Sequence, residues 1–209
     1  MSLTHATDTS LALADCFAIM SGGTIGRCAV EIPRGHCTCC LFDTGLDNWI
    51  GLFEGEYAEL ERRGTVADWE AVRDGMGLRC GRQRRAEVEA RPFACSNKPL
   101  DCAFYPFYPA GVARDATTGG YRIELAAGAP KCPIVSAGTS NVRDLIDQPR
   151  NSEEAHAIRV AACAVRLAEA GQQARIEELL AGYVAYGRRI TVLLPAADYA
   201  ALLRHRPQA

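Results

Sequence analysis

The chain has 209 residues, enough for one domain with an appendage, and a chain of this length buries about 70% of its unfolded surface on folding. Its formal net charge of −2 at pH 7 excludes nucleic-acid binding by bulk positive charge. With 48% hydrophobic and 23% charged residues, the composition also excludes large-scale disorder. The unusual number is the count of 10 cysteines.

A helix is expected over residues 9–20, near the start of the chain. From 28 to 135 the chain is rich in glycine, proline and cysteine, and only 52–63 and 66–73 show the apolar spacing of helices. Gly119-Gly120 predicts a hairpin, because apolar residues alternate directly after it. We expect a bound metal to hold the remaining loops of this half together.

The second half of the chain has stronger periodic signals. Asn151 is a good N-cap for an amphipathic helix that ends at Gly171, and a second helix is predicted over 172–186. A short strand is expected over 189–194, followed by a helix over 195–204 with proline in its first position.

These elements predict an α+β fold that is mostly α, with a loop-rich cysteine-cluster half and few short strands. We expect two regions. Residues 1–135 form a cysteine-cluster metal-binding domain, and residues 136–209 form a helical C-terminal region that packs on it.

The N-terminus argues against secretion, since it has no positively charged segment and Asp15 interrupts its apolar run. The sequence contains no stretch of 18 apolar residues, so we expect no membrane span. We therefore expect a cytoplasmic protein with reduced thiols, a setting in which clustered cysteines more often bind metal than each other. Cys16 and Cys163 lie in apolar stretches and are interpreted as buried small hydrophobes.

The other cysteines form the candidate metal site. A buried thiolate is costly unless it meets a cation, and four thiolates suit either tetrahedral zinc or an iron–sulfur cluster. Zinc ribbons usually present two tight cysteine pairs, whereas this chain has one tight group, so the pattern favours a cluster held by several loops, most simply [4Fe–4S]. The candidate ligands are Cys37, Cys39, Cys40, Cys80, Cys95, Cys102 and Cys132.

The order of these motifs resembles the YkgJ-like cysteine-cluster family, described as a zinc- or iron-chelating domain. The resemblance covers residues 28–135 and implies a metal centre. The opening Cys-x-Cys-Cys departs from the family's usual Cys-x-x-Cys-Cys. The matching segments are Cys37-Thr38-Cys39-Cys40, Cys80, Arg91-Pro92-Phe93-Ala94-Cys95, Tyr105-Pro106-Phe107 and Cys132-Pro133.

Two further residues are candidates for supporting the centre. The Arg91 guanidinium would offset the negative charge of a thiolate cluster, and Tyr105 begins an aromatic segment that either covers the site or simply packs in the core. For Cys28, a metal-ligand role and a position in the apolar core are both open. His156, in the amphipathic helix, is expected at the surface.

Three functions remain open at this point. The first is a metal-binding protein with a [4Fe–4S] cluster in a redox or modification role. The second is an enzyme whose metal has an open coordination position, marked by a non-cysteine ligand such as His36 or Asp43. The third is an interaction protein with structural zinc. The sequence predicts neither nucleic-acid nor membrane partners, and it does not identify a substrate or a protein partner.

Overall fold

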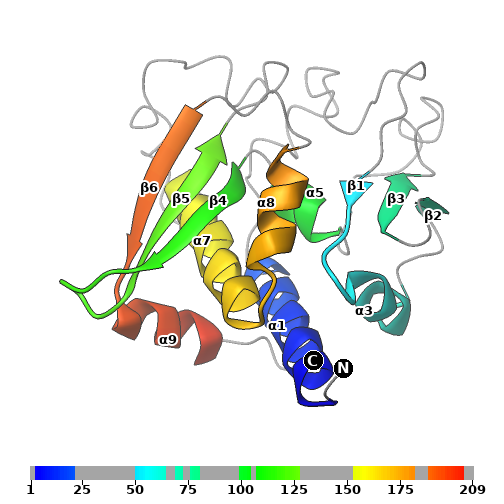
Figure 1. The fold of residues 1–209 in the computed structure, drawn as a ribbon, viewed down its shortest axis with the longest axis horizontal. Coiled ribbons are helices and arrows are strands. Elements are labelled where there is room, and N and C mark those ends of the chain that lie inside the picture. Colours follow the sequence, from blue (N-terminus) through cyan, green and yellow to red (C-terminus); the bar gives the residue numbers. More distant parts are fainter. Residues whose placement is uncertain are drawn as a thin grey trace.

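The computed structural model describes residues 3–21, 50–64, 69–72, 76–80, 99–104, 107–127, 153–181 and 188–204. In this part of the chain the fold is α+β, with helices and two small antiparallel sheets, as predicted (Figure 1). The helices are α1 (Leu3–Ser21), α3 (Glu56–Arg62), α5 (Leu100–Phe104), α7 (Glu153–Glu169), α8 (Gln173–Ala181) and α9 (Ala196–Arg204). The strands are β1 (Ile50–Gly51), β2 (Trp69–Val72), β3 (Gly77–Cys80), β4 (Phe107–Arg114), β5 (Tyr121–Ala127) and β6 (Arg188–Leu194).

The first sheet has the order β1-β3-β2 and overturns one prediction. The segment 66–73 was expected to be helical, but Trp69–Val72 forms strand β2, with Trp69 opposite Cys80. Pairing with a strand that lies farther along the chain outweighs the short helical spacing of two apolar residues. The neighbouring helix α3 begins later than predicted, because Gly55 adopts a left-handed conformation, with φ of 79°, just before it.

The second sheet has the order β4-β5-β6 and contains the predicted hairpin. Gly119, in its turn, has φ of 65°, which glycine adopts without strain. The alternating residues Tyr121, Ile123 and Leu125 all lie buried on one face of β5. The predicted strand over 189–194 is β6, which pairs with β5 from Tyr121 opposite Leu194 onward.

The predicted helices of the second half are confirmed where the structure describes them. Helix α7 is followed by Gly171 at φ of 81°, and α9 starts directly after Pro195, whose carbonyl accepts the Tyr199 N–H at 3.0 Å. Residues 182–187, which the second predicted helix includes, lie outside the described residues, as does Asn151. Helix α1 begins before the predicted residue 9.

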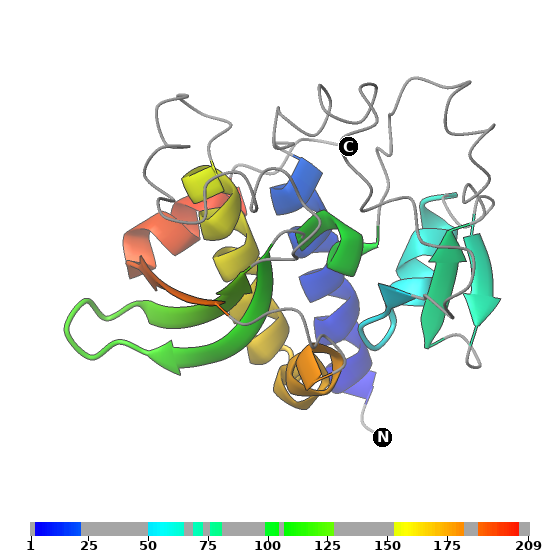
Figure 2. The same ribbon diagram turned by 90° about the horizontal axis from the view of Figure 1, so that it is seen from above.

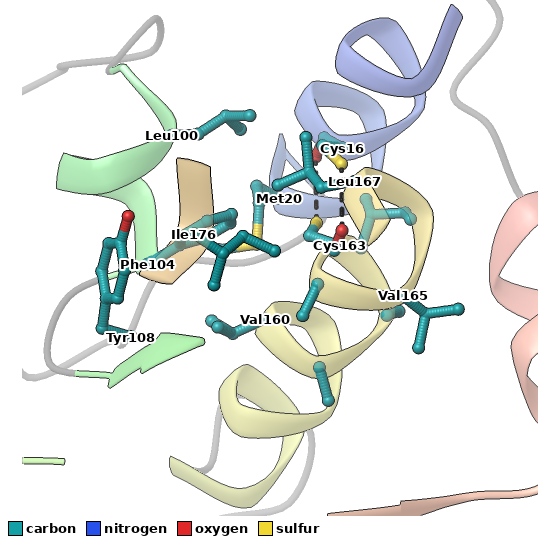
Figure 3. Packing of buried hydrophobic residues seen from close by; sticks show 14 of the residues in the cluster. Cys16, Met20, Leu100, Phe104, Tyr108, Val160, Cys163, Val165, Leu167 and Ile176 are labelled. Atoms are coloured by element: carbon teal, nitrogen blue, oxygen red, sulfur yellow. Dashed lines mark hydrogen bonds between the residues drawn. The ribbon is translucent and has the colours of Figure 1, made fainter. Parts of the chain in front are cut away.

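Helices α1 and α7 pack together, and α7 also contacts all three strands of the second sheet (Figures 1 and 2). Their buried side chains belong to one apolar cluster, part of which is drawn in Figure 3. The cluster also includes residues of both sheets. The predicted region boundary at 135/136 lies outside the described residues. Elements from both sides of it share this core, since α1 packs on α7 and β5 pairs with β6. No helix in the described ranges is long and apolar enough to cross a membrane.

Candidate metal centre

Two of the seven candidate ligands fall within the described residues, Cys80 and Cys102. The other positions lie outside them, so the structure gives no account of their surroundings. These positions are Cys37, Cys39, Cys40, Cys95 and Cys132, together with Arg91, Tyr105, Cys28, His36 and Asp43.

Cys80 is the last residue of β3, the central strand of the first sheet. Two residues before it, the fully buried Leu78 pairs with Ile50 of β1. Cys80 therefore marks the end of β3, two residues after a pair that fixes the register of the strand against β1.

Cys102 lies in the middle of α5 and is half-buried. The residues on either side of this single turn, Leu100 and Phe104, are fully buried. The Phe104 ring packs edge-on against Phe53 at 6.0 Å and against Tyr108 at 6.3 Å, measured between ring centroids. These contacts anchor α5 on both sides, because Phe53 follows β1 and Tyr108 belongs to β4.

Helix α5 thus joins the two sheets. It contacts β1 of the first sheet and β4 of the second, and it lies between them in both views (Figures 1 and 2). The chain leaves β5 toward Cys132 at Ala127, which pairs with Phe107 at the start of β4, only three residues after α5 ends. The end of β5 therefore also lies near this junction.

A buried glutamate holds α5 against the first sheet. The Glu56 side chain is fully buried and accepts the N–H of Leu100 at 2.6 Å and that of Phe53 at 2.9 Å. Burial raises its pKa to about 8; the nearby Asp101 carboxylate raises it as well, while the two backbone hydrogen bonds and Arg175 lower it. The carboxyl group therefore fixes the first residue of α5 relative to α3.

Sequence reasoning missed Glu56, although it contained a signal. The Phe53-x-x-Glu56 spacing lets the carboxyl accept a backbone N–H three residues earlier, as the glutamate of a capping box does, although Glu56 is the first residue of α3 and directly follows its N-cap, Gly55. The second hydrogen bond, to Leu100, joins residues 44 positions apart and has no local signal.

His156 was expected at the surface, and this prediction is wrong. The residue is only 4% exposed, and its Nε2 donates to the Phe104 carbonyl oxygen at 3.1 Å. Its ring lies 6.0 Å from that of Phe107. Helix α7 packs against the second sheet, and its residue His156 also reaches α5, so this polar position is covered. The imidazole thereby holds the carboxyl end of α5.

Two aromatic residues of the segment after α5 lie within the described residues and pack in the core. Phe107 and Tyr108 are 1% and 0% exposed, which bears out the packing interpretation for these two residues. Cys16 and Cys163 are both completely buried in the α1–α7 interface, as predicted.

Within the described ranges, no three or more His, Cys, Asp or Glu side chains form a group that could hold a metal ion. The described part of the candidate site consists of a central strand that ends in Cys80 and a short helical turn that carries Cys102. Comparison with protein-family models, curated proteins and solved structures found no match to this chain.

Proposed function

We propose that this chain is a cytoplasmic, cysteine-ligated metal protein that holds a [4Fe–4S] cluster in a redox or modification role. The observation that supports this most is the position of α5. This turn carries Cys102. It contacts β1, which pairs with the strand that ends in Cys80, and β4, which pairs with the strand after which the chain continues to Cys132.

Chain connectivity allows the other candidates to reach the same junction. Cys95 precedes Leu100 by five residues, and Cys132 follows Ala127 by five. Five residues span at most about 18 Å when fully extended. Cys40 precedes Ile50, the first residue of β1, by ten residues, which allows a reach of at most about 35 Å.

Among the described residues, Cys102 differs from the cysteines of the core. The apolar cluster takes up Cys16 and Cys163. Cys102 is only partly covered, whereas structural cysteines are usually deeply buried. A partly exposed cysteine on a fixed turn is the kind of ligand that a cluster bound by several loops would use.

Two residues outside the described ranges have supporting roles in this proposal. Arg91 would offset the negative charge that four thiolates bring, and Tyr105 would limit the access of water. Tyr105 directly follows Phe104, the last residue of α5, so it is covalently attached to the same turn as Cys102.

Anaerobic purification, with an absorption spectrum and iron, sulfide and zinc analysis on one sample, tests this proposal. The [4Fe–4S] centre predicts a brown protein with a broad band near about 400 nm and about four irons per chain. About one zinc in a colourless protein would replace it with a structural zinc site. A chain that binds neither metal would overturn the proposal altogether.

A further inference from the structure

Cys16 and Cys163 meet in the core although 147 positions separate them. The Cys16 thiol donates to the Cys163 carbonyl oxygen at 3.6 Å, and the Cys163 thiol donates to the Cys16 carbonyl oxygen at 3.6 Å. Figure 3 shows this exchange, with the two side chains pointing toward each other across α1 and α7. Each sulfur therefore lies beside the backbone of the other cysteine.

The register of the two helices at this point is fixed by an ion pair. Arg166 on α7 donates through Nε to Asp15 Oδ2 at 2.8 Å, and the two side chains are only 14% and 3% exposed. Asp15 directly precedes Cys16 on α1, and Arg166 follows Cys163 by three positions on α7. A shift of either helix by one turn would break the ion pair, so the two thiols are held opposite each other.

The surroundings keep both thiols unreactive in the packed state. Burial raises the pKa of Cys16 well above its usual value; the neighbouring Cys163 side chain and the charge of Asp15 raise it further, while Arg166 lowers it. Both residues have 0% exposure. The thiolate is the form that reacts with oxidants, so oxidation has to proceed through states in which α1 separates from α7.

We propose that Cys16 and Cys163 are an oxidisable dithiol pair that hydrogen peroxide converts into a disulfide between α1 and α7. One sulfur attacks a peroxide oxygen, the O–O bond breaks, and the products are a sulfenic acid and water. The second sulfur attacks the first, the S–O bond breaks, and the departing oxygen leaves as a second water with the second thiol's proton. The two thiols lose two electrons, and the peroxide gains them.

The disulfide would remain as a covalent mark that α1 had once separated from α7 in the presence of peroxide. Oxidation starts in the separated state, and redocking of the helices completes the disulfide, which then prevents further separation. The bond would close a loop that spans most of the chain, the class of cross-link that restricts the unfolded state most. The inference does not depend on the proposed metal, because neither cysteine is among the candidate ligands.

The sequence provides a clean assay by trypsin digestion without reduction. Tryptic peptide 1–27 contains Cys16 as its single cysteine, and peptide 160–166 contains only Cys163. After treatment of the native, full-length protein with hydrogen peroxide, we expect these peptides joined, two hydrogens lighter than their sum. Dithiothreitol should separate them again, and the oxidised protein should melt at least about 5 °C above oxidised Cys163→Ala.

The Cys163→Ala variant controls for oxidation of the other thiols and for any loss of metal, since it lacks only this pair. Recovery of both peptides in reduced form from a sample whose other cysteines are oxidised would overturn the inference. So would linkage of Cys16 and Cys163 to other cysteines instead of to each other.

Discussion

The α1–α7 interface and the α5 junction use the same residue type in opposite ways. In the interface, Cys16 and Cys163 are completely buried, hydrogen-bonded to each other's backbone, and adjacent to an ion pair. At the junction, Cys102 is half-buried on a short turn, and Cys80 ends a strand. Cys16 and Cys163, inside long helices, pack as small hydrophobes, whereas Cys102, in a short helical turn, is only partly covered.

The largest expected effect concerns the interface. Arg166→Met removes the guanidinium from the buried Asp15 carboxylate and should lower the free energy of unfolding by about 3–5 kcal/mol, measured by urea denaturation. The double variant Asp15→Leu/Arg166→Met should regain most of this loss, because no buried charge is then left without its partner.

A surface ion pair provides the matched control for this experiment. Arg122 and Glu124 lie 3.4 Å apart, with side chains that are 61% and 37% exposed. Arg122→Met should cost less than about 1 kcal/mol. Equal losses in the two single variants would contradict the importance of burial at the α1–α7 interface.

The second effect concerns the junction and depends on pH. Glu56 has a pKa of about 8 in the folded chain, against an ordinary value of 4.5, so between these values the folded state holds a proton that the unfolded state has lost. Stability from this group is complete below about pH 4.5 and falls as the pH rises toward 8, by about 1.4 kcal/mol per pH unit.

Glu56→Gln should remove this slope, because glutamine does not titrate and its amide oxygen can still accept one of the two backbone N–H groups. Urea denaturation of both proteins at several values between pH 5 and 7.5 measures the difference. The same pH dependence in the variant and the wild-type chain would show that the Glu56 carboxyl is not buried as described.

The smallest effect separates the two kinds of cysteine. Cys163→Ala should lower the free energy of unfolding by about 1–2 kcal/mol, because the missing sulfur leaves a small cavity in a fully packed interface. Its metal content should be that of the wild-type chain. A loss of metal in this variant would show that the interface and the junction are not chemically separate.

Local patterns predicted the elements whose signals are local. The α7 periodicity, its stop at Gly171 and the hairpin at Gly119 were all correct. Strand β2 was not predicted, because its pairing with β3 depends on the sheet and not on its own four residues. Local spacing therefore predicts secondary structure least well in such short segments, where pairing with another strand decides the conformation.

The polar groups of the core were not predictable for a similar reason. Asp15 was read as an interruption of an apolar run, but its partner Arg166 lies 151 positions away. The hydrogen bond of His156 to Phe104 spans 52 positions. A single sequence shows which residues are polar within an apolar stretch, and it does not show which of them find partners in the folded chain.

The most direct test of the account compares Cys102→Ser with Cys163→Ala and the wild-type chain, purified side by side without oxygen. Iron and sulfide per chain and the absorbance near about 400 nm are the quantities to measure. We expect a metal-loaded wild type, full loading of Cys163→Ala, and loss of most iron and sulfide from a folded Cys102→Ser. Equal iron and sulfide in all three proteins would contradict the assignment of Cys102 to the metal centre.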